Sequence, residues 1–225
     1  EEWEERPYDI VIYGATGFVG QLMVQHLDAL LSKGASRSSH TWAVAGRNIT
    51  RLSKIARGCR SSPGILEART ANELAEMVGR CRVVVNAAGP SAKAGEPVVR
   101  ACVEQGTDYV DVSCEHQWIR HVIDKYHEAA KERGVAVICS VGQASASFDI
   151  MCAKLVERLG PLARTRIYLS ENRAESGGEL SSKIASLEQL AERTAEFEQD
   201  PFSLGGRRRS GDRPEDSVCV EFARS

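Results

Sequence analysis

A glycine-rich stretch near the start of the chain most constrains its fold. Gly14, Gly17 and Gly20 recur at every third position within "DIVIYGATGFVGQ", residues 9–21. The β-branched and aromatic residues before them are typical of a buried strand, and those after them carry apolar side chains at helical intervals. The stretch therefore predicts a strand, a tight glycine turn and a helix.

The same order of strand and helix repeats as far as about residue 170. The expected strands are residues 8–13, 41–46, 65–69, 82–88, 109–113, 135–141 and 163–170. The expected helices are residues 17–32, 48–57, 71–79, 95–106, 116–133 and 147–159. This alternation predicts an α/β fold with a Rossmann-type, doubly wound and mostly parallel sheet. Thr70 or Asn72 is expected to cap the third helix, and Gly106 and Gly134 to end the fourth and fifth.

The three glycines are spaced as in sites that bind phosphate. Gly14 permits the sharp turn, Gly17 lets the backbone approach a pyrophosphate, and Gly20 lets the helix pack closely on the sheet. The helix start offers unpaired N–H groups and the positive end of its dipole. A glycine turn without a ligand is the alternative, and the entropic cost of three glycines in one turn argues against it.

The end of the second expected strand bears on the choice of nucleotide. The sequence "TWAVAGRN" places Arg47 and Asn48 where a NAD-specific site has an acidic residue for the ribose 2′-hydroxyl. Arginine pairs with a 2′-phosphate in a forked geometry. The pattern favours NADP(H) over NAD(H), with a solvated arginine at a helix start as the alternative.

A third element follows the fourth expected strand. Ala88, Gly89 and Pro90 lie within "NAAGPSAKAGEP", residues 86–97. Small residues let a loop pass close to a flat ligand, and loops at the carboxyl ends of the strands line the binding crevice of a doubly wound sheet. We expect this loop near the nicotinamide side of a dinucleotide, with a tight strand-to-helix turn as the alternative.

Composition excludes several classes of protein. A net charge of -2 argues against a broad nucleic-acid surface, and the apolar runs are of strand length, too short to span a membrane. The seven cysteines are widely spaced without a C-x-x-C pair, which is typical of reduced thiols in an intracellular protein. No zinc-ligand spacing is present, so no metal site is expected. No signal peptide is visible. The expected location is cytoplasmic, or peripheral on an intracellular membrane.

The pattern changes towards the C-terminal end. We expect residues 1–160 to form an NADP-binding Rossmann domain, and residues 161–225 to begin a second domain for substrate binding or dimerisation that is incomplete here. Residues 200–217 are polar and rich in Gly, Pro and Arg, which predicts a flexible segment. Its run of three arginines is expected to be solvated, with contact to an acidic partner or a lipid headgroup as the alternative.

Five blocks of sequence together resemble the saccharopine dehydrogenase-like oxidoreductases, a family similar to the trans-acting enoyl reductases. The blocks are "YDIVIYGATGFVGQ", "WAVAGRN", "VVVNAAGP", "GEPVVRACVEQGTDYVDVSCE" and "YHEAAKERGVAVI". The resemblance implies an NADP-type Rossmann domain followed by an α+β domain. It implies nucleotide contacts at Gly14, Thr16, Gly17, Phe18, Arg47, Ala88, Gly89 and Pro90. Gly20, Ala15 and Asn48, from the same motifs, complete the predicted cofactor site.

One segment departs from the family's pattern. Family members commonly follow the sixth strand with a G-F-D-S-x-P-x-D type of segment, whereas residues 142–149 read "GQASASFD". Gly142 and Asp149 remain, but the aromatic residue, the first aspartate and the proline do not. The departure concerns the substrate side of the site more than the cofactor side.

Hydride transfer also needs a group that supplies or accepts a proton. The Tyr-x-x-x-Lys pair of short-chain dehydrogenases is absent from the sequence. The best remaining cluster is "VDVSCEHQW", residues 110–118, in which Glu115 or His116 would carry a proton and Cys114 would be a substrate-facing thiol. A helix start capped by Ser113 is the alternative explanation of this cluster.

These expectations combine into an NADP(H)-dependent oxidoreductase of the saccharopine dehydrogenase-like type, with a carbonyl, imine or enoyl substrate. The alternative is a nucleotide-binding scaffold without catalysis that acts through protein or lipid-surface partners. A NAD-binding redox sensor is a third class, and Arg47 counts against it. The expected partner is a small-molecule substrate, with no nucleic acid and no transmembrane segment. A homodimer and peripheral contact with a lipid surface stay open.

Overall fold

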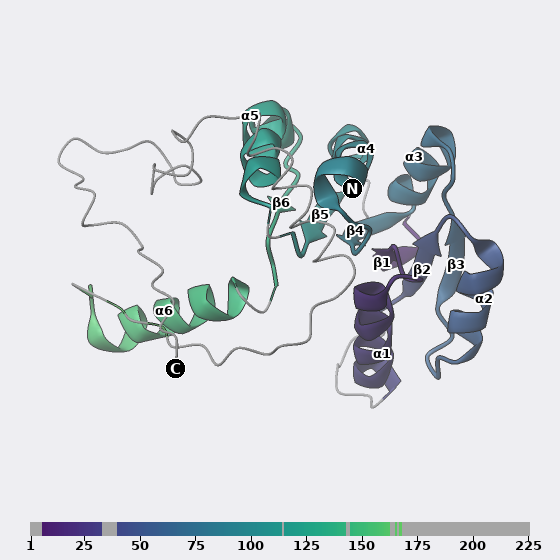
Figure 1. Cartoon of the computed structure of the whole chain (residues 1–225), viewed down its shortest axis with the longest axis horizontal. Helices are drawn as coiled ribbons and strands as arrows, with labels where there is room; N and C mark the ends of the chain where they lie inside the picture. Colours follow the sequence, from purple (N-terminus) through teal and green to yellow (C-terminus); the bar gives the residue numbers. More distant parts are fainter. Residues whose placement is uncertain are drawn as a thin grey trace.

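The computed structural model describes residues 6–32, 40–113, 115–142 and 145–162, together with residues 165 and 167. Strands and helices alternate along the chain (Figure 1). The strands are β1 (Tyr8–Tyr13), β2 (Trp42–Gly46), β3 (Gly64–Glu67), β4 (Cys81–Asn86), β5 (Asp108–Asp111) and β6 (Val137–Ile138). The helices are α1 (Phe18–Ser32), α2 (Ile49–Arg57), α3 (Ala71–Gly79), α4 (Ser91–Gln105), α5 (His116–Glu132) and α6 (Ala146–Leu159).

The described strands form one parallel sheet in the order β3-β2-β1-β4-β5-β6. The order reverses at β1, which pairs with β2 on one side and with β4 on the other. In such sheets ligands bind outside the carboxyl ends of the strands at this switch point. The predicted Rossmann-type fold is confirmed. The expected strand at 163–170 and the flexible segment at 200–217 lie outside the described residues, apart from positions 165 and 167.

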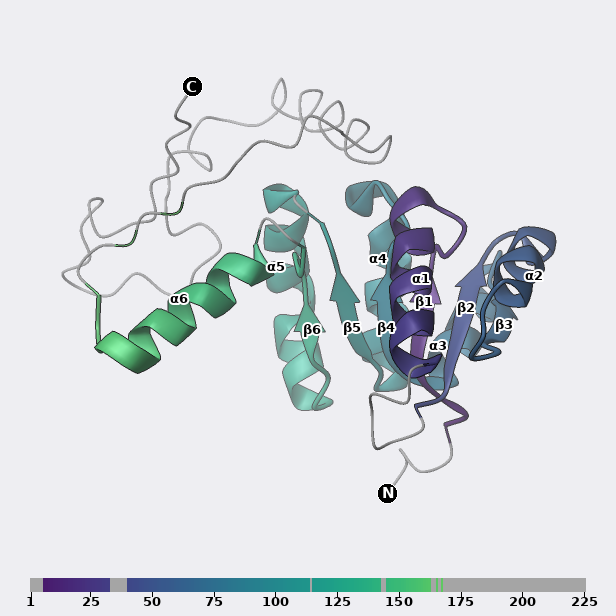
Figure 2. The same ribbon diagram turned by 90° about the horizontal axis from the view of Figure 1, so that it is seen from below.

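Alternation of side chains along the strands divides the core between the two faces of the sheet. Val11 and Ala43 pack in a cluster with residues of α3, α4 and α5, whereas Ile12 and Val44 pack in a second cluster with residues of α1 and α2. Figure 2 shows α1 in front of the sheet and α4 behind it. A parallel sheet covered on both faces explains why its strands read as nearly continuous apolar runs.

Local chemistry ends several helices as the sequence predicts. Thr70, and not Asn72, caps α3: its hydroxyl accepts from the amide of Glu73, whose carboxylate accepts from the amide of Thr70. Gly106 and Gly134 follow α4 and α5 with φ values of 67° and 66°, in the left-handed region that favours glycine.

Two boundaries differ from the expectation for tertiary reasons. Helix α4 begins at Ser91 instead of residue 95, because the carboxylate of Glu115 accepts hydrogen bonds from the amides of Ser91 and Ala92 at 2.8 and 3.0 Å. This contact satisfies amides that a helix start leaves without partners. Strand β6 is shorter than residues 135–141, because Ser140 adopts a φ of 63° and turns the chain.

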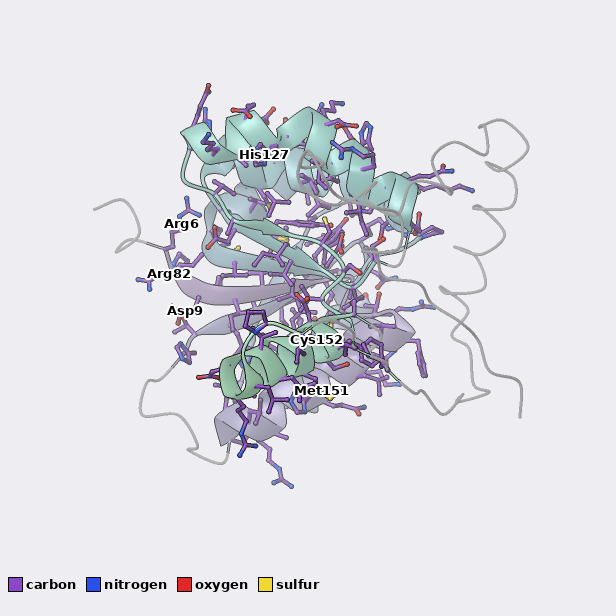
Figure 3. The ribbon with its side chains drawn as sticks, turned by 90° about the vertical axis from the view of Figure 1, so that its left-hand side faces the viewer. Arg6, Asp9, Arg82, His127, Met151 and Cys152 are labelled. Atoms are coloured by element: carbon purple, nitrogen blue, oxygen red, sulfur yellow. The ribbon has the colours of Figure 1, made fainter. Side chains whose placement is uncertain are left out.

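Polar contacts join the strands at the amino-terminal edge of the sheet. Asp9 accepts from the amide of Thr41 at 2.8 Å and lies 3.7 Å from the guanidinium of Arg82. Arg6 donates to the carbonyl of Cys81 at 2.6 Å. Figure 3 shows Arg6, Asp9 and Arg82 gathered at this edge. It is the edge opposite to the carboxyl ends of the strands.

Helix α6 differs from the other described helices in its packing. It extends away from the sheet in both Figure 1 and Figure 2, and none of its residues is buried. Large apolar side chains on it stay exposed, among them Met151, labelled in Figure 3, and Leu159. In the described part of the chain, no helix is both long and apolar enough to cross a membrane. The five described cysteines are free thiols, as expected.

Helices α4 and α5 are joined through one carboxylate. Glu96 of α4 accepts from Lys125 at 2.5 Å and from the hydroxyl of Tyr126 at 2.6 Å, and it lies 2.6 Å from the ring nitrogen of His121. Burial raises the pKa of Glu96, but these hydrogen bonds outweigh burial and lower the pKa to about 2.

We expect Glu96→Gln to reduce the free energy of unfolding at pH 7 by about 1–2 kcal/mol, because the carboxylate is only partly buried and solvent screens its charge. A lowered folded-state pKa stabilises above the ordinary value of 4.5, and this contribution is lost as the pH falls from there to about 2. Urea denaturation at pH 7 and pH 2.5 should therefore show the variant and the wild type converging in acid. Glu104→Gln, on the exposed face of α4, is the control; an equal loss from it would contradict the assignment.

Candidate functional site

Three of the predicted motifs meet at the carboxyl ends of β1, β2 and β4. The amides of Gly14 and Ala15 donate to the carbonyl of Ala45 at 3.0 and 3.2 Å, and the amide of Ala87 donates to the carbonyl of Tyr13 at 2.8 Å. The sheet thereby brings together the glycine turn (residues 14–17), the arginine loop (residues 46–48) and the β4 loop (residues 87–90). The crevice of a doubly wound sheet is expected at this place.

Two of the three glycines are required by the protein's own packing. Gly14 has a φ of 83°, and a Cβ there would lie 2.6 Å from the amide nitrogen of Ala88. A Cβ on Gly20 would lie 2.2 Å from the carbonyl oxygen of Gly14. No side chain fits at either position, because real Cβ contacts are much longer than this. Gly14 thus allows the glycine turn to approach the β4 loop, and Gly20 allows α1 to pack on that turn.

Gly17 is different, because the described protein crowds it much less than it crowds Gly14 and Gly20. A Cβ at Gly17 would meet one atom within 4 Å, the carbonyl oxygen of Gly14 at 3.3 Å. Gly17 is exposed, and so is the next side chain, Phe18, at 67%. The amides of Phe18 and Val19, in the first turn of α1, donate no hydrogen bond to any described residue. An accessible helix start beside a small residue is suited to hold a phosphate group.

Two other residues of the glycine turn have roles in packing. Ala15 is fully buried in the core cluster shared with α1 and α2, and its amide donates a hydrogen bond to the carbonyl of Ala45. The carbonyl of Thr16 accepts from the side-chain amide of Gln21 at 3.1 Å, which stabilises the start of α1. Contact of Ala15 or Thr16 with a cofactor stays a prediction.

Arg47 lies exposed at the carboxyl end of β2, immediately before α2. The guanidinium of Arg47 is near enough to Tyr13, the last residue of β1, to affect its pKa. Burial raises the pKa of Tyr13, and the charge of Arg47 partly offsets that rise. Sequence reasoning did not single out Tyr13, because only the pairing of β1 with β2 brings the two residues near each other. Within the described part of the chain, Arg47 makes no hydrogen bond or ion pair that binding of an anion would break.

Asn48, predicted beside Arg47, has a structural role. Its side-chain oxygen accepts from the amide of Arg51 at 3.0 Å and caps α2. The structure therefore gives Asn48 a function that needs no ligand, and its contact with a cofactor stays a prediction.

The tertiary structure adds a carboxylate that the sequence pattern of the arginine loop does not contain. Glu67 ends β3 and is in register with Gly46 of β2. Its carboxylate lies 3.8 Å from the guanidinium of Arg69. Since Glu67 pairs with Arg69, the charge that it brings to this edge of the sheet is partly balanced.

The β4 loop is held at both of its ends. Asn86 is 2% exposed, and its side-chain oxygen accepts from the amide of Ala88 at 3.0 Å. Gly89 is exposed, and the peptide bond between Gly89 and Pro90 is cis. Pro90 is followed directly by α4, so the loop ends where Glu115 caps that helix.

The predicted proton carrier Glu115 is 9% exposed and engaged in the protein's own structure. Its two carboxylate oxygens accept from Ser91 and Ala92, as described above. Ser113 does not cap α5 in the way considered from the sequence: Glu115 is the residue before the helix, and the hydroxyl of Ser113 accepts from its amide at 3.2 Å. This geometry favours a structural role for Glu115, and proton transfer by it stays a prediction.

The other two predicted catalytic residues are only partly placed. Cys114 lies outside the described residues. His116 is the first residue of α5, and only the backbone of His116 is described.

A further ionisable group of β5, Tyr109, is buried, and both burial and the neighbouring Asp111 raise its pKa far above the usual range. Tyr109 therefore keeps its proton near neutral pH, and its buried hydroxyl donates that proton's hydrogen bond to Asp111. No three His, Cys, Asp or Glu side chains of the described segments lie close enough together to hold a metal ion.

Comparison with known proteins agrees with this architecture. The model of the saccharopine dehydrogenase NADP binding domain matches residues 10–138. The saccharopine dehydrogenase-like oxidoreductase of Bos taurus is 38% identical over 159 residues, covering 65% of this chain and 37% of that protein. The trans-acting enoyl reductase of Mycobacterium tuberculosis is 33% identical over 241 aligned positions, covering 98% of this chain and 54% of that protein. The chain thus spans between about a third and about half of the length of these relatives.

A solved structure shares the fold. The apo form of saccharopine dehydrogenase (L-Glu forming) from Saccharomyces cerevisiae superposes with a TM-score of 0.53 at 17% identity, over 68% of this chain and 31% of that chain. At this level of identity the likeness concerns the fold alone.

We expect Gly20→Ala to reduce the free energy of unfolding by about 2–3 kcal/mol, because the added methyl group would collide with the backbone of Gly14. Gly17→Ala should cost at most about 1 kcal/mol, since the nearest atom needs to move by only a few tenths of an ångström. Urea denaturation of the two variants measures the difference. Equal losses of stability in the two variants would show that Gly17 is packed as tightly as Gly20 in the folded protein.

Proposed function

The chain belongs to the family of the saccharopine dehydrogenase NADP binding domain, and from this premise we propose that it binds NADP(H) as part of an oxidoreductase. The substrate class is a small molecule with a carbonyl, imine or enoyl group, to or from which a hydride is transferred. The names of the relatives, an oxidoreductase and an enoyl reductase, support this reaction class.

The observation that carries the proposal is the contrast among the three glycines. Packing accounts for Gly14 and Gly20, whereas a Cβ at Gly17, beside the accessible first turn of α1, would press on one atom alone, the carbonyl oxygen of Gly14 at 3.3 Å. A pyrophosphate needs close approach to the backbone and N–H donors, and both are present here. The residues therefore fit the phosphate-bearing part of a dinucleotide.

Arg47 supports the choice of NADP(H). The accessible guanidinium at the carboxyl end of β2 would pair with a 2′-phosphate, which NAD(H) lacks. The pairing of Glu67 with Arg69 lessens the repulsion that a carboxylate at this edge would exert on such a phosphate. The β4 loop would line the nicotinamide side.

Bound NADPH supplies the hydride, and the protein positions the substrate and manages the proton. Of the three predicted catalytic residues, Glu115 already holds the start of α4, so we propose His116 as the proton carrier at this edge. The substrate itself would be selected largely by the part of the protein that follows the Rossmann region.

The hydrogen bonds of Glu115 to the start of α4 also agree with the alternative function, a nucleotide-binding scaffold without catalysis. A protein that retained the nucleotide site but acts as a scaffold would keep Glu115 for stability and need no proton carrier. Turnover decides between the two: we expect NADPH consumption with at least one member of a panel of carbonyl, imine and enoyl compounds. Tight NADPH binding without turnover on any of them would favour the scaffold.

We expect Arg47→Ala to lower the affinity for NADPH about ten- to a hundredfold and to leave the affinity for NADH unchanged, since about 1.5–3 kcal/mol of contact with the 2′-phosphate is lost. Fluorescence titration of the full chain with both nucleotides measures this. Arg57→Ala, which removes the same charge at the far end of α2, is the matched control. Gly17→Ala, at the phosphate site that both nucleotides would share, should lower the affinity for NADPH and for NADH alike. Equal losses from Arg47→Ala and Arg57→Ala would show that only the general charge of α2 matters.

A further inference from the structure

Asp111, at the end of β5, is a buried acceptor of hydrogen bonds from several segments. It is 1% exposed, and its carboxylate accepts from the hydroxyl of Tyr109 at 2.9 Å and from the indole of Trp118 at 3.2 Å. It also accepts from the amides of Ser113 at 3.0 Å and Ser140 at 2.8 Å. One side chain thereby fixes the segments that follow β5 and β6, together with α5.

One chain of hydrogen bonds leads from Asp111 to the start of the β4 loop. The hydroxyl of Tyr109, which donates to Asp111, accepts from the side-chain amide of Asn86 at 3.0 Å. The oxygen of that same amide group accepts from the amide of Ala88. Because Asn86 and Tyr109 are both buried, this path is fully shielded from solvent.

A second chain leads to the end of the same loop. Asp111 accepts from the amide of Ser113, whose hydroxyl accepts from the amide of Glu115. The carboxylate of Glu115 then holds Ser91 and Ala92, the first residues after the β4 loop. The two paths end on either side of the exposed Gly89 and the neighbouring Pro90.

Asp111 also holds a strained residue beyond β6. Ser140 has a φ of 63°, a conformation that costs a non-glycine residue energy. Its amide donates to the Asp111 carboxylate, and the next amide, that of Val141, donates to the Asp111 carbonyl at 2.7 Å. Such strain persists only where the surroundings hold it, and it is common at ligand sites.

The ordering of the sheet says which half of a dinucleotide these loops would meet. The arginine loop follows β2 and the glycine turn follows β1, so the adenosine and the pyrophosphate would lie over that half of the sheet. The remaining half, over β4, β5 and β6, is left for the nicotinamide. The hydrogen bonds of Asp111 and its partners end on the loops of this second half.

We propose that Asp111 is a positioning residue, which through Tyr109 and Asn86 sets the β4 loop for the nicotinamide half of the cofactor. This inference rests on the proposed binding of NADP(H) and adds to it the group that orients one half of the ligand. Asp111 itself does not touch the ligand.

Tyr109→Phe tests the proposal, because it removes the hydroxyl between Asp111 and Asn86 and keeps the ring in the core. The full chain is titrated with NADPH and with adenosine 2′,5′-bisphosphate, which carries the adenosine half and lacks the nicotinamide. We expect the affinity for NADPH to fall about tenfold and the affinity for the bisphosphate to change less than about twofold. A purely structural role would weaken both ligands together.

Thr107→Val is the matched control. It also removes a buried hydroxyl, one that donates to the carbonyl of Val78 at 2.9 Å, but it lies just before β5, at the opposite edge of the sheet. It should lower stability and leave both affinities unchanged. If Tyr109→Phe does not fold, Ser113→Ala interrupts the second path, and the same split between the two ligands is expected at about threefold.

The outcomes are distinct. Equal weakening of both ligands in Tyr109→Phe, or unchanged affinity for NADPH, overturns the positioning role while the proposed function stands. The absence of binding of either ligand to the wild-type chain overturns the proposed function and the positioning role with it. Selective loss of NADPH affinity supports both.

Discussion

The turn after β1 passes so close to the loop after β4 that no side chain fits between them. A Cβ on Gly14 would lie within 3 Å of three backbone atoms of Ala87 and Ala88. This approach is possible because β1 pairs directly with β4, and Ala87 continues that pairing by donating to the carbonyl of Tyr13. The glycine turn and the β4 loop thus lie in direct backbone contact. The position of the α1 start, and with it the candidate phosphate site, follows from this contact.

Buried polar groups hold the other loops of the candidate site. Asp111, Tyr109 and Asn86 each have hydrogen-bond partners, as buried polar groups must if they are not to destabilise the fold. Buried networks of this kind favour one arrangement of the loops that they hold, because any other arrangement leaves a donor or acceptor without a partner. Glu115 is a similar case. The sequence suggested it as a proton carrier, but its carboxylate accepts hydrogen bonds from the first amides of α4 and stabilises the start of that helix.

The division of the sheet into two halves separates the parts of the proposed function. Residues near β1 and β2 fit the phosphates of a dinucleotide, and the loops after β4, β5 and β6 would meet the reacting end. Beyond β6, α6 exposes apolar side chains such as Met151 and Leu155, and the relatives are about twice as long as this chain. Selection of the substrate stays a proposal for residues outside the Rossmann region.

The sequence by itself determined the alternation of strands and helices, the glycine turn, the helix end at Gly106 and the place of Arg47, and it limited the cap of α3 to Thr70 or Asn72. These features depend on neighbours a few residues apart, through side-chain periodicity, backbone conformation and local hydrogen bonds. Only the tertiary structure decided that α4 begins at Ser91, that Glu115 is a cap and that Asp111 joins three segments. The bonds from Ser91 to Glu115 and from Ser140 to Asp111 join residues 24 and 29 positions apart, which the folded sheet brings together and no local pattern of sequence encodes.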